Sequence, residues 1–144
     1  MVNKVSVIIP TYNGGSRGYL LDAVRSALAQ VYDNIEVIAV DDGSSDNTYE
    51  VLSSVMDSRL KIIRQENRGL AAARNTGIKN SSGDFVAFLD DDDIWEKDKL
   101  NNCLAAFEEN TSVGLVFSGA YVIDADGKKL SYRCQALSDD IIGQ

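Results

Sequence analysis

The sequence contains no histidine, and this absence removes several kinds of catalytic site. Without an imidazole there is no Ser-His-Asp or Cys-His nucleophile system, no HExxH metal site and no histidine base. The two cysteines, Cys103 and Cys134, are too few for a disulfide framework or a four-cysteine zinc site. Carboxylates, hydroxyls, amides and basic side chains are therefore the groups that remain for chemistry.

Long apolar runs are also missing. No stretch approaches the roughly 20 apolar residues that a membrane-spanning helix requires. The run Val5–Ile9 ends at Pro10 and is too short for the apolar part of a signal peptide. We therefore expect no transmembrane segment in this chain and a cytoplasmic location, at the inner face of the membrane if a longer parent protein supplies further segments.

Basic residues are the minority, since 14 Lys and Arg stand against 22 Asp and Glu and give a net charge of −8. A chain with this charge repels a phosphate backbone, so we expect no nucleic-acid partner. The acidic surplus is concentrated at residues 84–98, which hold seven acidic residues and one basic residue. The length of 144 residues suits one domain, which we place at 1–131, followed by an unpatterned tail at 132–144.

The chain alternates β-branched apolar runs with amphipathic stretches. We predict helices at 19–31, 69–80 and around 100–107, and one that Ser44, Ser45 or Asp46 caps. The predicted strands are 5–9, 35–40, 60–63, 85–89, 113–117 and 120–123, the last followed by a turn at 126–127. This alternation predicts an α/β fold with a mainly parallel central sheet flanked by helices.

Polar residues follow the first, second and fourth predicted strands, at 10–15, 41–46 and 90–93. Because the carboxyl ends of parallel strands meet at one edge of a sheet, where ligands of α/β proteins bind, we expect the functional site there. The run Asp90–Asp93 is the sharpest signal, since four adjacent carboxylates repel one another unless something compensates them. A divalent Mg²⁺ or Mn²⁺ ion would do so, whereas the simpler interpretation is a solvated acidic turn that also caps the next helix.

Two further motifs allow two interpretations each. Asp41-Asp42-Gly43 is either a common turn or a carboxylate that accepts hydrogen bonds from a base or ribose. Arg74, in the small-residue stretch 67–77, is either a solvent-facing side chain on a packed helix or a contact to a base or phosphate. The loop at 14–18 fits neither a Walker-type cradle nor GxGxxG, so a metal would have to neutralise any bound diphosphate.

Four segments, 5–13, 36–48, 67–77 and 83–93, together closely resemble the family 2 glycosyltransferases. The resemblance runs from Val5 to Lys128 and preserves the order and spacing of the motifs. It implies a GT-A fold (Rossmann-like, of the nucleotide-diphospho-sugar transferase type) and an inverting enzyme. It also implies a UDP-linked donor, Mn²⁺ or Mg²⁺ as cofactor, and a glycan or lipid-linked acceptor in the synthesis of cell-envelope polysaccharides.

The resemblance also implies roles for individual residues, carried over position by position. Asp92, with Asp90, would ligate the metal within the DXD element Asp90–Asp92. Tyr12 would lie near the uracil, and Asp42 and Arg74 would contact the base. The residues expected to bind the nucleotide are Pro10, Thr11, Tyr12, Asp41, Asp42, Arg74, Asp90 and Asp91.

One departure from the family concerns the carboxylate base that deprotonates the acceptor hydroxyl. The family carries it well after the DXD element, and only 51 residues follow Asp93 here. Asp124 and Asp126 belong to a strand end and a turn, and Asp139-Asp140 belongs to the tail. We assign none of them as the base and expect it beyond Gln144, in an acceptor-binding part.

Three other functions remain for comparison. A non-catalytic nucleotide-sugar-binding module would share the fold and the pocket. A phosphorylated signalling receiver needs an acidic pair after the first strand, where Pro10–Asn13 stands instead. A nucleotidyltransferase needs a glycine-rich basic loop there, for which the loop at 14–18 is a poor substitute.

Overall fold

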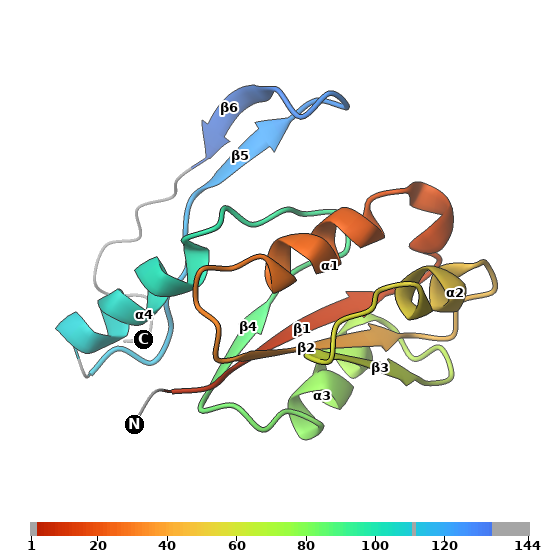
Figure 1. The fold of residues 1–144 in the computed structure, drawn as a ribbon, viewed down its shortest axis with the longest axis horizontal. Helices are drawn as coiled ribbons and strands as arrows, with labels where there is room; N and C mark the ends of the chain where they lie inside the picture. Colours follow the sequence, from red (N-terminus) through yellow and green to blue (C-terminus); the bar gives the residue numbers. More distant parts are fainter. Residues whose placement is uncertain (1–2, 111, 134–144) are drawn as a thin grey trace, which may run out of the picture. The chain divides into compact units, whose positions relative to one another are not determined.

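The computed structural model describes residues 3–110 and 112–133, and the chain divides into two compact units, 1–101 and 102–144. The first unit contains a four-stranded sheet in the order β3-β2-β1-β4, with every neighbouring pair parallel (Figure 1). Its strands are β1 (Val5–Thr11), β2 (Ile35–Asp41), β3 (Leu60–Arg64) and β4 (Phe85–Phe88). The predicted α/β class and mainly parallel sheet are confirmed.

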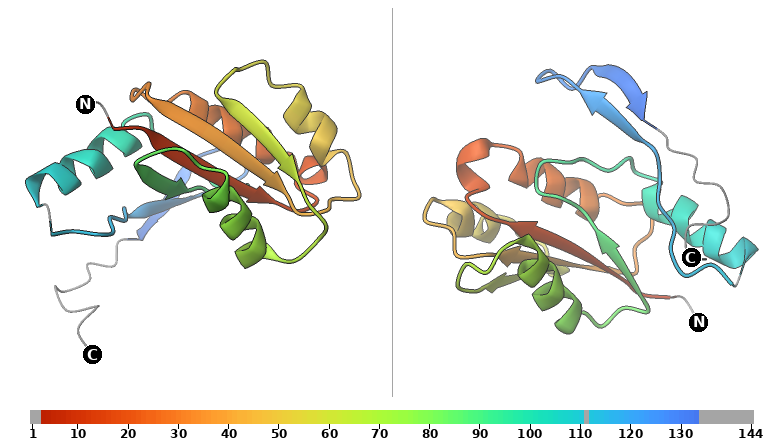
Figure 2. Two further views of the ribbon diagram at one scale, coloured as in Figure 1. Left: turned by 90° about the horizontal axis from the view of Figure 1, so that it is seen from below. Right: turned by 180° about the vertical axis from the view of Figure 1, so that it is seen from behind.

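Helices cover both faces of this sheet. Helices α1 (Leu20–Leu28) and α2 (Thr48–Ser53) lie on one face and α3 (Leu70–Lys79) lies on the other (Figures 1 and 2). All seven residues of β1 are buried, which is typical of a central strand covered on both faces. The prediction of a helix to residue 31 is too long, because α1 ends at Leu28 and Val31 is 57% exposed.

Small residues bring α3 close to the sheet. Ala73 and Gly77 are buried on the side of α3 that faces the strands. A Cβ atom at Gly77 would lie 2.3 Å from Cγ2 of Ile8, closer than any van der Waals contact. The small-residue stretch therefore serves helix–sheet packing, as one of its two interpretations predicts.

The strand order reverses between β1 and β4. The chain steps outward from β1 to β2 and β3, and then crosses back so that β4 pairs with the other edge of β1, Ile8 opposite Phe88. Such a reversal leaves a crevice outside the carboxyl ends of the two strands, because their connections leave in opposite directions. This crevice is bounded by the residues that follow β1 and β4.

The second unit contains most of α4 (Lys99–Glu109), whose first residues belong to the first unit, and an antiparallel hairpin. The hairpin pairs β5 (Ala120–Ile123) with β6 (Lys129–Arg133), and the Tyr121 and Tyr132 rings lie 4.9 Å apart. The turn predicted at 126–127 is confirmed by the positive φ of 78° at Gly127.

One strand prediction fails in this unit, and one strand of the unit was not predicted. The prediction of a strand at 113–117 is wrong, since this segment joins no ladder among the described residues and Leu115 is 72% exposed. An apolar run alone does not form a strand without a partner to satisfy its backbone. Strand β6 was not predicted, because its sequence, Lys129-Leu-Ser-Tyr-Arg133, is largely polar. Cys134 and the rest of the predicted tail, 134–144, lie outside the described residues.

Candidate functional site

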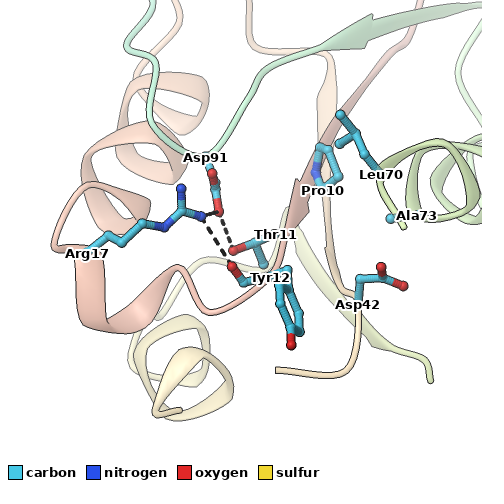
Figure 3. A pocket seen from close by; sticks show the side chains of 8 residues that line it. All are labelled: Pro10, Thr11, Tyr12, Arg17, Asp42, Leu70, Ala73 and Asp91. Atoms are coloured by element: carbon cyan, nitrogen blue, oxygen red, sulfur yellow. Dashed lines mark hydrogen bonds and ion pairs between the residues drawn. The ribbon is translucent and has the colours of Figure 1, made fainter. Parts of the chain in front are cut away.

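An open pocket of about 170 Å³ lies at the carboxyl ends of the strands. It is formed where β1, β2 and β4 end, against the first turns of α3 and the loop after β1 (Figure 3). The pocket is lined by Pro10, Thr11, Tyr12, Arg17, Asp42, Leu70, Ala73 and Asp91.

Five of the predicted nucleotide-binding residues line this pocket: Pro10, Thr11, Tyr12, Asp42 and Asp91. The other predicted residues, namely Asp41, Arg74, Asp90 and Asp92, are not among the lining residues. The sequence did not single out Arg17, Leu70 and Ala73 as pocket residues. In the sequence, Arg17 stands out only as a basic residue in a glycine-rich loop after the first strand. It belongs to no motif that would have identified it as a pocket residue.

Asp91 is a buried carboxylate in the pocket wall, with 8% of the residue exposed. Its Oδ2 accepts a hydrogen bond from Thr11 Oγ1 at 2.5 Å and another from Arg17 Nη2 at 2.6 Å. Burial raises the pKa of Asp91, and the charges of Asp92 and Asp90 raise it further against the opposing effects of Thr11 and Arg17. The pocket therefore contains a nearly buried carboxylate that two specific neighbours, Thr11 and Arg17, hold in place.

Asp42 lines the pocket on another side from Asp91. Its Oδ1 accepts hydrogen bonds from Gln65 Nε2 at 2.6 Å and from the Arg68 backbone N–H at 3.0 Å, and its Oδ2 accepts the Gly69 N–H at 2.7 Å. Burial raises the pKa of Asp42, but these hydrogen bonds and the Arg68 charge outweigh it and lower the pKa. Asp42 thus ties the loop that precedes α3 to the end of β2.

Asp41 points to a different environment from its neighbour Asp42. It is fully buried, its Oδ1 accepts the Ser44 N–H at 2.8 Å, and its Oδ2 lies 3.3 Å from Arg64 Nε. Gly43, with a φ of 76°, allows the chain to turn between Asp41 and Ser44. In this structure Asp41 stabilises the turn that follows β2.

Arg74 and Asp90 form an ion pair beside the pocket. Arg74 Nη2 lies 2.6 Å from Asp90 Oδ1, and the guanidinium lies 5.7 Å from the centre of the Phe88 ring. Arg74 is therefore neither free in solvent nor part of the pocket lining. It holds one of the four adjacent carboxylates.

Asp92 and Asp93, the last two carboxylates of the run Asp90–Asp93, are exposed. Burial raises the pKa of Asp93, and the charges of Asp92 and Asp90 add to the rise. No group of three carboxylate or thiol side chains within the described ranges is arranged to hold a metal ion. Mg²⁺ is commonly held by one or two carboxylates together with substrate phosphates, so the oxygen donors of Asp90 and Asp92 suit a site that a diphosphate completes.

Among the described residues, every helix is too short or too polar to span a membrane.

Comparison with sequence families shows that residues 6–136 match glycosyl transferase family 2. The chain belongs to this family. The resemblance identified from its four motifs is thereby confirmed.

Curated relatives of this family 2 chain are glycosyltransferases of greater length. It is 43% identical over 111 residues to an uncharacterised glycosyltransferase of Rickettsia conorii, a match that covers 76% of this chain and 18% of that protein. It is 39% identical over 119 residues to the Escherichia coli UDP-Glc:alpha-D-GlcNAc-diphosphoundecaprenol beta-1,3-glucosyltransferase WfaP, covering 82% of this chain and 46% of that protein. The chain thus spans less than half the length of both relatives.

Two solved structures share the fold of this family 2 chain. S. aureus TarS in complex with UDP-GlcNAc superposes with a TM-score of 0.68 at 33% identity, over 75% of this chain and 32% of that one. The Pyrobaculum calidifontis mannosyltransferase PcManGT, in complex with GDP-Man and Mn²⁺, gives a TM-score of 0.69 at 29% identity, over 77% and 34%. The fold is therefore GT-A, as the sequence resemblance implied.

Proposed function

We propose that this chain is the donor-binding part of an inverting glycosyltransferase that transfers sugar from a nucleotide diphosphate to a hydroxyl of a glycan or lipid-linked acceptor. The observation that carries the proposal is the convergence of Thr11, Tyr12, Asp42 and Asp91 on one pocket, in a chain of family 2. UDP is the proposed nucleotide, because TarS binds UDP-GlcNAc and WfaP is named for UDP-Glc.

The pocket residues suit a nucleoside. Tyr12 is 49% exposed, and its ring offers a stacking face for a base beside the apolar surface of Leu70. A carboxylate has about four acceptor positions, and three of those on Asp42 are used by the protein, so one remains for a base N–H. Asp91 would accept a ribose hydroxyl.

Asp92 and Asp90 would hold a divalent cation, Mn²⁺ or Mg²⁺. When bound, such a cation supplies Lewis-acid stabilisation of the departing nucleoside diphosphate. The Arg74–Asp90 ion pair, at 2.6 Å, would keep one Asp90 oxygen in a fixed position, while exposed Asp92 is accessible to a cation from solvent.

The acceptor hydroxyl requires a carboxylate base, which we place outside this chain. Asp124 already accepts the backbone N–H groups of Asp126 and Lys128 in the hairpin turn, at 3.1 and 2.9 Å. The diphosphoundecaprenol acceptor in the name of WfaP supports a lipid-linked acceptor and a role in cell-envelope polysaccharide synthesis. We therefore place the reaction in the cytoplasm, at the inner face of the membrane.

Titration calorimetry of the chain with UDP, with and without Mn²⁺, tests this proposal. We expect binding that requires Mn²⁺ and that weakens at least about tenfold in Asp92→Asn, since a metal ligand is lost. Asp98→Asn removes the same charge from an exposed residue nearby and should bind as the wild type does. Metal-independent binding, or equal affinity in Asp92→Asn, would contradict the metal site, and tighter binding of GDP would contradict the choice of UDP.

A further inference from the structure

Arg17 is the one basic residue among the eight that line the pocket. It belongs to the short 3-10 helix η1 (Gly15–Arg17), in the loop between β1 and α1. Figure 3 shows its guanidinium pointing to Asp91, next to Thr11 and Tyr12. Neither the family motifs nor the proposed function gives this residue a role.

Two glycines allow the loop to pack closely, Gly14 against the carboxylate that Arg17 binds and Gly15 against the start of α2. A Cβ atom at Gly14 would lie 2.3 Å from Thr11 Oγ1 and 2.8 Å from Asp91 Oδ2. A Cβ atom at Gly15 would lie 2.7 Å from the backbone nitrogen of Thr48, where α2 begins. The loop at 14–18, which resembles no phosphate cradle, therefore has a structural reason for its paired glycines.

The loop is also held by hydrogen bonds to the segment after β2. The backbone N–H of Asn13 donates to Ser44 Oγ at 2.9 Å, and that of Gly15 donates to Thr48 Oγ1 at 3.0 Å. The Ser16 N–H donates to Asp46 Oδ2 at 2.9 Å. These contacts fix the backbone of η1 before any ligand binds.

The Arg17 side chain is held at several points although 44% of it is exposed. Nη2 donates to Asp91 Oδ2 at 2.6 Å and to the Tyr12 carbonyl at 3.4 Å, and Nε donates to the Asn13 carbonyl at 3.4 Å. Ordering a long side chain at a surface costs conformational entropy. An arginine held in this way is pre-organised to keep one carboxylate in one orientation.

We propose that Arg17 is a positioning residue that fixes Asp91 to recognise the ribose of the bound nucleotide. The bonds from Arg17 and Thr11 both end on Oδ2, so Oδ1 is the oxygen that neither of them uses. A carboxylate accepts hydrogen bonds from hydroxyl and N–H groups and repels phosphates. The proposed function gives the base N–H to Asp42, so the partner of Asp91 in a nucleoside diphosphate is the ribose. The inference rests on the proposed function, since it assumes that the pocket binds a nucleotide.

The positive charge of Arg17 also helps to keep the Asp91 carboxylate in position. Asp91 is flanked by the carboxylates of Asp90 and Asp92, and the diphosphate of the ligand is also negative. A nearly buried carboxylate without a counter-ion is costly, and it would turn toward solvent. Arg17 keeps Asp91 in place as an acceptor while other negative charges gather around it.

The experiment compares UDP with 2′-deoxy-UDP and 3′-deoxy-UDP by calorimetry in the presence of Mn²⁺. The wild-type chain should prefer UDP to at least one deoxy analogue by roughly tenfold, the usual effect of one hydrogen bond to a charged group. In Arg17→Gln this preference should fall nearly to unity. Arg25→Gln removes the same charge from an exposed position on α1 and should keep the wild-type preference.

The outcomes separate the inference from the function on which it rests. A wild-type chain that fails to bind UDP contradicts the proposed function. If the wild-type chain prefers UDP to a deoxy analogue and Arg17→Gln keeps the same preference, the role of Arg17 is overturned while the proposed function stands. This holds even if Arg17→Gln binds all three nucleotides more weakly, because a uniform loss of affinity identifies a phosphate contact. If Arg17→Gln lowers the melting temperature too far for binding to be measured, Arg17→Lys decides. A reduced preference in that variant supports the role and an equal preference overturns it.

Discussion

Gln65 and Asp42 are joined by a hydrogen bond in which Gln65 Nε2 donates to the Asp42 carboxylate at 2.6 Å. Gln65 follows β3 and Asp42 follows β2, so the bond links two strand ends beside the pocket. The Oε1 atom of Gln65 in turn accepts the Thr76 hydroxyl at 2.5 Å. One amide therefore connects two strands to α3 and holds the pocket wall together.

Replacing Gln65 by leucine should lower the free energy of unfolding by about 1–2 kcal/mol, because Asp42 and Thr76 each lose a hydrogen-bond partner. It should also raise the pKa of Asp42, since one of the donors that lower it is removed. Urea denaturation at neutral pH measures the first effect. Glu66→Gln, at the exposed neighbouring position, is the control, and equal stability of the two variants would contradict this role of Gln65.

Replacing Gly77 by alanine should destabilise the chain although alanine favours helices. The helix propensity gain is about 1 kcal/mol. Overpacking against Ile8, where the new methyl would lie 2.3 Å from Cγ2, should outweigh it by about 1–2 kcal/mol. Gly114→Ala provides the matched control, because a methyl group there would meet no atom within 4 Å. Thermal unfolding should place the melting temperature of Gly77→Ala clearly below that of Gly114→Ala, and the reverse order would refute close packing of α3 on β1.

The main elements of the first unit could be predicted from the sequence because two independent signals agree there. The run Val5–Ile9 is β-branched and apolar, and it forms a strand buried along its whole length. The predicted cap of α2 is off by one residue at least, since the N-cap is Asn47 and makes no side-chain cap hydrogen bond, although Asp46 Oδ1 accepts the Thr48 N–H at 3.1 Å. The second unit lacks such agreement, since 113–117 is apolar without pairing and β6 pairs without an apolar pattern.

The candidate site could be predicted as far as strand ends determine it. Thr11 ends β1, Asp42 directly follows β2, and Asp91 lies three residues after β4, so the order of parallel strands brings them to one edge of the sheet. The place of Arg17 depends instead on the path of a loop, which two glycines and several side-chain contacts determine. Asp41 and Asp42 have different surroundings for two reasons. Side chains alternate along a strand, which the sequence shows, but the partners that each carboxylate meets come from distant parts of the chain, which the local sequence does not show.

Glu36 should make the stability of the chain depend on acidic pH. Its carboxylate accepts hydrogen bonds from Ser6 Oγ at 2.6 Å and from the Ser82 N–H and hydroxyl at 2.7 and 2.9 Å. Burial raises the pKa of Glu36, but these hydrogen bonds and the Lys4 charge outweigh it and bring the pKa from 4.5 to about 2. Because the folded pKa is the lower one, the stabilisation is complete above the pKa of the unfolded chain and is lost as the pH falls toward 2.

We therefore expect Glu36→Gln to be less stable than the wild type at pH 7 by about 2 kcal/mol, and the difference to shrink as the pH falls from 4.5 to 2. Denaturant unfolding at a series of pH values measures this difference. Glu66→Gln removes an equal charge from an exposed site and should show no such trend. A difference between Glu36→Gln and the wild type that stays constant across this range would rule out the predicted titration.

The position of β1 in the sheet has a consequence for the order of events during synthesis. It is made before both of its partners and lies between them, with Val5 paired to Ile35 on one side and to Phe85 on the other. At translation rates of roughly 5–20 residues per second, β4 follows β1 by about 4–16 s. During that interval the nascent chain carries an apolar strand with one open edge, the kind of surface that chaperones protect from aggregation.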